Sequence, residues 1–296
     1  MTDWAALAQR GSRACHDLIG WIYFDPTAAE MYGELGVPDG MGYYVGSRFA
    51  PLAGASNGVI GATAYSISEV FLGMGMDLMR EHTDAESVML ARDARVLPGL
   101  AEISPAIAEG LAPLASRAWE VVDGLHNGAR VLFAAHRDRV ERHAGEPALS
   151  AWLAFNCIRE WRGDTHWALI AAADLNGAEV GLIHNLMVDY EEAEWIVRSR
   201  GATDEEVALG WARLERKGLV VDRVFTDEAR TLRQDIEQRT DEICAQVWEA
   251  VGEADTLAFC ELLEPHHDAF IARIDATAGK NWMPAARHTH GEGTGV

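Results

Sequence analysis

The stretch EEAEWIVRSRGATDEEVALGWARLERKGLVVDRVFTDEARTLRQDIEQRTDEI, from Glu191 to Ile243, decides the fold of this chain. Apolar residues recur in it at helical spacing, and Gly201 interrupts the pattern between two predicted helices. A short hairpin is predicted around Asp222 and Arg223, and a long helix follows. The predicted order is therefore helix, turn, helix, hairpin, helix, and a generic helical hairpin with a short connection is the alternative.

This order resembles the winged helix-turn-helix of the MarR-like regulators. Leu214-Glu215 and Lys217-Gly218-Leu219 match the end of the recognition helix in that fold, and Phe225 to Ala229 match the start of its dimerisation helix. Nearly the whole chain is also similar to an actinobacterial family described only as helix-turn-helix-like, which implies a fold and no activity. The residues that carry this second resemblance are His16 before the aromatic run Trp21, Tyr23 and Phe24, then Arg48-Phe49-Ala50-Pro51-Leu52, and Arg159-Glu160-Trp161-Arg162-Gly163-Asp164-Thr165-His166.

The two halves of the chain show signs of an internal duplication. An offset of 150 residues places His16 on His166, and each half ends an apolar helix in a turn with a capping residue, Asp25 in one case and Asn176 in the other. We therefore expect a mainly α protein of two tandem degenerate winged-helix repeats related by a pseudo-two-fold axis. The expected units are residues 1–145, residues 146–284 and a disordered tail at 285–296, with the boundary at the helix-breaking Gly145 and Pro147.

Charge and composition restrict the partners of the protein. The chain has 296 residues, 49% of them hydrophobic, and a formal net charge of -21, which repels phosphate backbones and anionic membranes. Acids occupy Asp204, Glu205 and Glu206, where a recognition helix would enter a DNA groove, and Arg223 is the one base at the tip of the hairpin. We predict no nucleic-acid partner and no membrane partner.

The sequence carries no familiar metal or cofactor motif. Its four cysteines form no CxxC pair, and it contains no HExxH, P-loop, GxGxxG at a strand end or GxSxG pattern. No metal site is expected, and the cofactor stays unknown. The first residues lack a basic start followed by an apolar run, so we expect a cytoplasmic protein.

The candidate catalytic residues are His16, Asp164 and His166. Gly163 is typical of a helix end and Asp164 of an N-cap, so we expect a helix corner there, with Arg162 beside the exposed N–H groups as an anion site. His166 in the first turn is then a candidate acid or base. If the halves are duplicates, His16 meets His166 across the pseudo-two-fold axis. The alternative for each histidine alone is a packed core residue.

Aromatic residues crowd the same segments and predict a small-molecule pocket between the repeats. The expected function is binding of a small organic molecule by a protein that has lost DNA binding; whether it acts as an enzyme of specialised metabolism is left open. The alternatives are a MarR-like ligand-responsive transcription regulator and a scaffold without a ligand. We expect a monomer that acts as a pseudo-dimer, or a homodimer. The candidate ligand-binding residues are Arg162, Trp21, Tyr23, Tyr65, Trp167 and His184.

Overall fold

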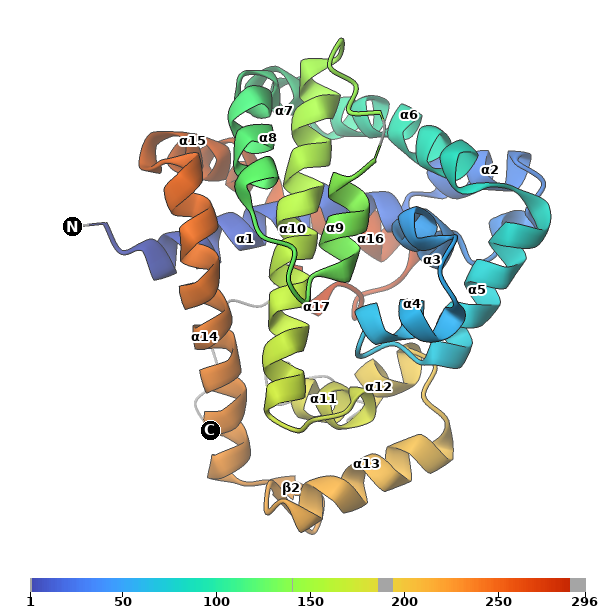
Figure 1. Ribbon diagram of the computed structural model, residues 1–296, viewed down its shortest axis with the longest axis vertical. Helices are drawn as coiled ribbons and strands as arrows, with labels where there is room; N and C mark the ends of the chain where they lie inside the picture. Colours follow the sequence, from blue (N-terminus) through green and yellow to red (C-terminus); the bar gives the residue numbers. More distant parts are fainter. Residues whose placement is uncertain (1, 140, 186–193, 288–296) are drawn as a thin grey trace.

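The computed structural model describes residues 2–139, 141–185 and 194–287, which form a mainly α-helical protein (Figure 1). The helices are α1 Trp4–Gly20, α2 Pro26–Glu34, α3 Tyr43–Phe49, α4 Asn57–Thr63, α5 Glu69–His82, α6 Ala85–Ile103, α7 Pro105–Leu111, α8 Ala115–Gly124, α9 Val131–Arg137, α10 Pro147–Ala172, α11 Gly177–His184, α12 Trp195–Ser199, α13 Asp204–Arg216, α14 Asp227–Val251, α15 Glu253–Leu263, α16 His267–Thr277 and α17 Pro284–Arg287. The strands are β1 Val220–Val221 and β2 Val224–Phe225.

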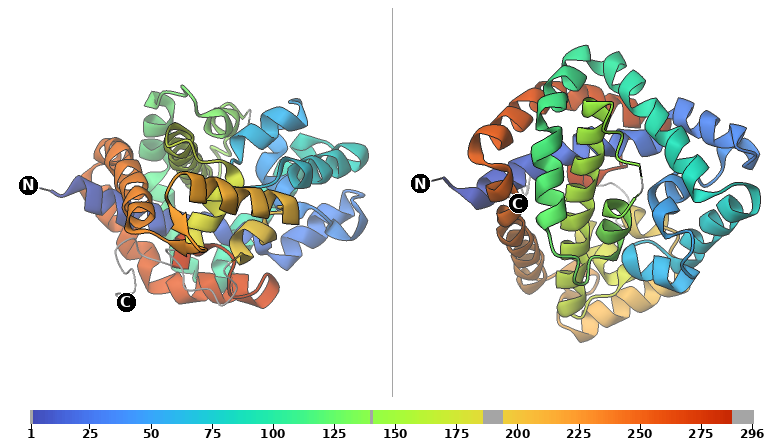
Figure 2. Two further views of the ribbon diagram at one scale, coloured as in Figure 1. Left: turned by 90° about the horizontal axis from the view of Figure 1, so that it is seen from below. Right: turned by 45° about the horizontal axis from the view of Figure 1, so that its top comes forward.

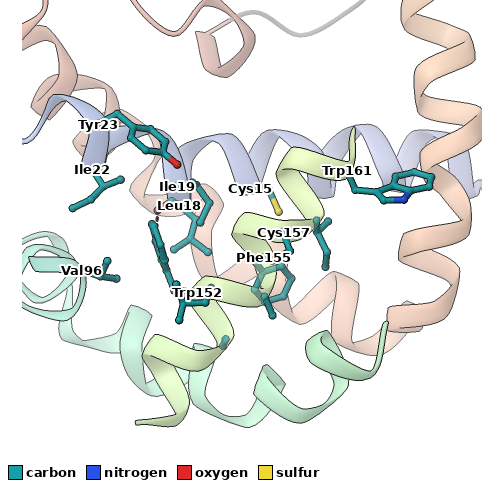
Figure 3. Close-up of a cluster of buried hydrophobic side chains, with 14 of the residues drawn as sticks. Cys15, Leu18, Ile19, Ile22, Tyr23, Val96, Trp152, Phe155, Cys157 and Trp161 are labelled. Carbon is teal, nitrogen blue, oxygen red and sulfur yellow. Dashed lines mark hydrogen bonds between the residues drawn. The ribbon is translucent and has the colours of Figure 1, made fainter. Parts of the chain in front are cut away.

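The long helix α10 runs through the centre of the protein, where it packs against α1, α8, α9 and α14 (Figures 1 and 2). The larger hydrophobic core surrounds it and takes residues from both sides of position 145, including Trp21, Trp152 and Trp248. Figure 3 shows part of this core, where the Trp152 indole N–H donates to the Leu18 carbonyl of α1. The smaller core lies among α11, α13, β1 and α14 and contains Trp211 and Leu214.

The capping residues of the sequence start the helices that were expected of them. Asp25 accepts a hydrogen bond from the Ala28 N–H, with Pro26 at the first helical position of α2. Asn176 and Glu179 form a reciprocal capping box at the start of α11. Asp25 is fully buried and also binds Arg95 and Arg273, so the start of α2 is tied to α6 and α16.

The predicted helix corner at Gly163 and Asp164 is wrong. α10 is continuous from Pro147 to Ala172, and both residues lie in its interior. The Asp164 carboxylate accepts a hydrogen bond from the Phe133 N–H of α9 at 2.9 Å. The Asp164 side chain therefore caps a neighbouring helix. Gly163 lowers the stability of α10 only by the modest amount that is usual for a glycine inside a helix.

The predicted order of elements in the second half is confirmed for residues 195–251. Gly201, with a φ of 83°, makes the turn between α12 and α13, and a Thr203–Glu206 capping box starts α13. Asp222 and Arg223 both have positive φ, as the two-residue loop between β1 and β2 requires. Within the described residues β1 and β2 are the only strands, so the tandem repeat and its pseudo-two-fold axis stay predictions.

The elements α11, α12, α13, β1 and β2 lie at one end of the molecule and α6 and α7 at the other (Figures 1 and 2). The Ser68 N–H of the first half donates to the Arg200 carbonyl between α12 and α13 at 2.9 Å, and the Tyr65 hydroxyl donates to the Leu175 carbonyl, just before α11, at 2.6 Å. In the described part of the chain, no helix is long and apolar enough to cross a membrane.

Candidate ligand-binding site

One face of α10 carries a set of buried and partly buried polar residues that contact α1, α3, α11 and α14. Arg159, Arg162 and His166 share this face because they are spaced three and four residues apart on a continuous helix. We call the whole set the polar belt. Its members are His16 of α1, Tyr44 and Arg48 of α3, Arg159, Glu160, Arg162 and His166 of α10, His184 of α11, and Arg233, Glu237, Thr240 and Asp241 of α14.

At one end of the belt, two arginines share one carboxylate. Arg48 binds both oxygens of Glu160, at 3.1 and 2.8 Å, and Arg159 binds Oε1 at 2.6 Å. The Glu160 side chain is only 1% exposed. Burial acts to raise the pKa of this carboxyl, but the positive charges of Arg48 and Arg159 hold it at about 2. Glu160 is therefore ionised throughout the physiological range.

His16 lies beside this group and is neutral. Its Nδ1 accepts a hydrogen bond from Arg159 Nε at 3.3 Å. Burial and the nearby charges of Arg159 and Arg162 lower the pKa of His16 well below its usual value. Because Nδ1 is the acceptor, the single ring proton resides on Nε2, and His16 presents a donor on that side.

At the other end of the belt, α10 is joined to α14 by ion pairs. Arg162 Nη2 donates to Asp241 at 2.9 Å and to Glu237 at 3.3 Å. His166 Nδ1 lies 3.1 Å from the Thr240 hydroxyl, and its Nε2 lies 3.7 Å from Glu237. Since the Thr240 hydroxyl donates its proton to the Ile236 carbonyl, its oxygen accepts from His166 Nδ1.

His184 also reaches this end of the belt. Its Nδ1 lies 3.1 Å from Arg233 Nη2, and Arg233 forms an ion pair with Glu237. Burial and the charge of Arg233 lower the pKa of His184 well below its usual value, so it is a neutral acceptor. The structure thus places four predicted residues, His16, Arg162, His166 and His184, along one belt.

Asp164 and Trp21 lie elsewhere. Asp164 points away from Arg162 and His166 and toward α9, one helical turn beyond Glu160, and burial raises its pKa to about 7 although the Phe133 N–H acts to lower it. The Trp21 side chain is fully buried in the larger core, its N–H donates to the Leu18 carbonyl, and Arg273 lies 4.6 Å from its ring centroid. These contacts account for both residues structurally.

The remaining predicted aromatic residues border the belt. The Tyr23 hydroxyl donates to Asn156 at 3.3 Å, and the Arg159 guanidinium lies 5.7 Å from the Tyr23 ring centroid. Tyr65 stacks on Trp167 with ring centroids 6.2 Å apart, and Trp167 meets the His166 ring at 5.3 Å. Tyr65 and Trp167 therefore connect the first half to the end of α10.

A pocket of about 310 Å³ adjoins the belt at Tyr44. It lies between the first half, α12 and the C-terminal segment. Aromatic pairs connect its walls. The centroid of the Phe24 ring lies 5.7 Å from that of Tyr44 and 5.5 Å from that of Trp282, and the Trp282 and Trp195 centroids are 5.4 Å apart. The lining residues are Phe24, Tyr44, Ile67, Phe71, Trp195, Ile196, Ser199, Arg200, Ala278, Trp282, Met283 and Pro284.

Sequence reasoning missed most of the partners that organise the belt and the pocket. Glu237 and Asp241 are spaced i and i+4 in α14, and Arg233 precedes Glu237 by the same interval, so one buried polar stripe was visible in the sequence. Arg48 and Glu160 were recognised in the sequence only as parts of the family resemblance, not as an ion pair. Trp195 and Trp282 stand 87 positions apart, and no local pattern pairs them.

The face of α13 that a DNA-binding protein would use is acidic. Its exposed residues include Asp204, Glu205, Glu206 and Glu215, against Arg216 as an exposed base. At the hairpin, Arg223 forms an ion pair with Glu194 at 2.9 Å and lies 5.2 Å from the Trp211 ring centroid. In the described residues, no group of three or more metal-ligating side chains is present.

The model of the Helix-turn-helix family matches residues 8–277. No curated protein matches the chain. No solved structure matches it either.

Proposed function

The chain belongs to the Helix-turn-helix family, and we propose that it uses this fold to bind a small organic molecule in the pocket beside the polar belt. The observation that carries the proposal is the pocket itself, which has aromatic walls, adjoins a buried charged network and is open to a ligand. Its volume of about 310 Å³ falls at the lower end of the range of small-molecule sites.

Tyr44 connects the pocket to the belt. Its oxygen accepts a hydrogen bond from Arg48 Nη1 at 2.9 Å, and its own hydroxyl proton has no acceptor among the described residues. A phenol whose oxygen already receives a bond from an arginine is a stronger donor. Tyr44 is therefore suited to orient a polar group of a ligand whose apolar body lies against Phe24 and Trp282.

The finer parts of this proposal concern architecture and chemistry. The chain would consist of two degenerate winged-helix repeats of MarR-like descent. A monomer would then have the geometry of a dimer, with the ligand between the repeats. If the protein is an enzyme of specialised metabolism, His16 and His166 are its candidate proton carriers. Their placement on one belt favours this, whereas Asp164 binds the Phe133 N–H of α9.

A ligand-responsive transcription regulator is the second candidate. Family membership and the helix-turn-helix order favour it. The acidic exposed face of α13 and the net charge of -21 oppose it, because phosphate contacts supply most of the affinity of duplex binding. Fluorescence anisotropy with labelled genomic duplex fragments decides between the two: we expect no salt-dependent binding, and a specific complex with a steep salt dependence would favour the regulator.

Titration with the fluorescent probe anilinonaphthalene sulfonate (ANS) tests ligand binding. Ser199 lines the pocket, so Ser199→Phe places a ring inside it, whereas Leu90→Phe adds a ring at a position that is 44% exposed on α6. We expect one ANS site, weakened at least about tenfold by Ser199→Phe, which corresponds to ~1.4 kcal/mol, and unchanged in Leu90→Phe. Equal affinity in all three proteins would refute the pocket.

A further inference from the structure

A second, much smaller cavity lies between α1, α10 and α14. Its volume is about 10 Å³, the space that one water molecule or one small ion fills. The polar groups in its lining belong to Ser12, His16, Arg159 and Arg162, and the thiols of Cys15 and Cys244 lie beside them. It does not share a lining residue with the aromatic pocket.

The lining of this cavity is largely apolar, and its polar side-chain groups are mainly hydrogen-bond donors. Arg162 Nε is buried and has no hydrogen-bond partner. In the described part of the chain, Arg159 Nη2 and Arg162 Nη1 have no partner either, since the bonds of these side chains use Nε and Nη1 of Arg159 and Nη2 of Arg162. His16 carries its proton on Nε2, so it also donates. None of the described residues that line the cavity carries a carboxylate.

The charges of the belt add up to an excess of positive charge on this side. Arg48 and Arg159 face one carboxylate, Glu160, and the neutral His16 adds nothing. At the other end, Arg162 and Arg233 are balanced by Glu237 and Asp241. Among the residues that the structure describes, one positive charge is thus uncompensated on side chains that are 12% exposed or less, and burial makes such a charge costly.

We propose that this cavity binds one small inorganic anion of about the size of chloride. A water molecule would have to place its two protons on acceptors, and the lining side chains offer one oxygen, that of Ser12, beside the weakly accepting sulfurs of Cys15 and Cys244. An anion accepts from both guanidinium groups, from His16 Nε2 and from the Ser12 hydroxyl, and it neutralises the excess charge. The proposal goes beyond the binding of an organic ligand and stands without it.

Bromide crystallography tests the proposal directly. Crystals of the full chain grown in sodium bromide are measured at the bromine absorption edge. We expect an anomalous peak in the cavity, within hydrogen-bonding distance of Arg159 and Arg162. A cavity that holds only water density without an anomalous peak overturns the proposal.

A matched pair of variants tests it in solution. Ser12→Val fills the cavity and removes one donor, whereas Ser47→Val changes a buried helical serine outside it. At equal ionic strength, we expect the wild type and Ser47→Val to melt about 2–4 °C higher in chloride than in gluconate, which is too large for the cavity. Ser12→Val should melt at the same temperature in both salts. A wild type without this difference, or a Ser12→Val that keeps it, contradicts the anion site.

Discussion

The two sides of α10 carry polar residues that are close in sequence but bind different helices. On one face, Arg159, Arg162 and His166 belong to the polar belt and join α10 to α1 and α14. On the other, Asp164 holds the start of α9, and the Thr165 hydroxyl accepts from Arg130 at 3.0 Å. Neighbours in sequence point about 100° apart on a helix, so a run of polar residues is divided between two environments.

The largest expected effect comes from the belt side. Glu160→Leu leaves Arg48 and Arg159 buried without their shared carboxylate, and we expect a loss of about 3–5 kcal/mol in the free energy of unfolding. Urea denaturation measures it. The exposed pair of Arg239 and Glu242 is the control, since Glu242→Gln should cost less than about 0.5 kcal/mol. A cost for Glu160→Leu below about 1 kcal/mol would show that the belt is not a coupled network.

A smaller, pH-dependent effect is expected on the α9 side. Burial raises the pKa of Asp164 to about 7, so the folded state holds this proton more tightly than the unfolded state, where the carboxyl has an ordinary pKa of about 3.8. The contribution of Asp164 to stability is therefore fully present below about pH 3.8 and is lost as the pH rises to about 7. Asp164→Asn should remove this part of the pH dependence and keep an acceptor for the Phe133 N–H.

Urea midpoints measured from pH 4 to pH 8 test this expectation. Relative to the wild type, Asp164→Asn should gain stability steadily as the pH rises, and its deficit at pH 4 should stay within about 2 kcal/mol, the upper range for a lost cap. A difference between the two proteins that does not vary with pH would mean that Asp164 is ionised in the fold at all these pH values.

The smallest loss of stability is expected from a residue on the α9 side that does not titrate. Thr165→Val removes the acceptor of Arg130 and the hydroxyl that donates to the Trp161 carbonyl, so we expect a loss of about 0.5–1.5 kcal/mol. Because Thr165 does not titrate, this loss should be the same at pH 4 and pH 8, unlike that of Asp164→Asn. ANS affinity should also be unchanged, and a weakened ANS site would mean that the α9 side takes part in binding.

Local signals in the sequence predicted local structure well. Asp25, Asn176 and the hairpin at Asp222 and Arg223 are found as expected, because caps and two-residue turns depend on residues only a few positions apart. Gly163 and Asp164 misled for the same reason. Their local preference is for a helix end, but burial of α10 on several sides and the tertiary bond to Phe133 outweigh it.

The candidate site was only partly predictable. His16, Arg162, His166 and His184 were identified and lie on one belt, but Glu237 and Asp241, which bind Arg162, come from α14, 75 and 79 residues further along the chain. The pocket depends on still longer separations, since Phe24, Trp195 and Trp282 meet only after the chain has folded. A single sequence holds no local pattern that records such contacts.

A crystallographic fragment screen locates the preferred binding site for organic molecules on this protein. Crystals of the full chain soaked with a library of small aromatic and aliphatic compounds show where the protein prefers to bind organic molecules. The account predicts that bound fragments gather in the pocket between Phe24, Tyr44, Trp195 and Trp282, with a polar atom at the Tyr44 hydroxyl. Fragments that bind on the α9 side of α10 or only at the exposed surface, with the pocket empty, would contradict it.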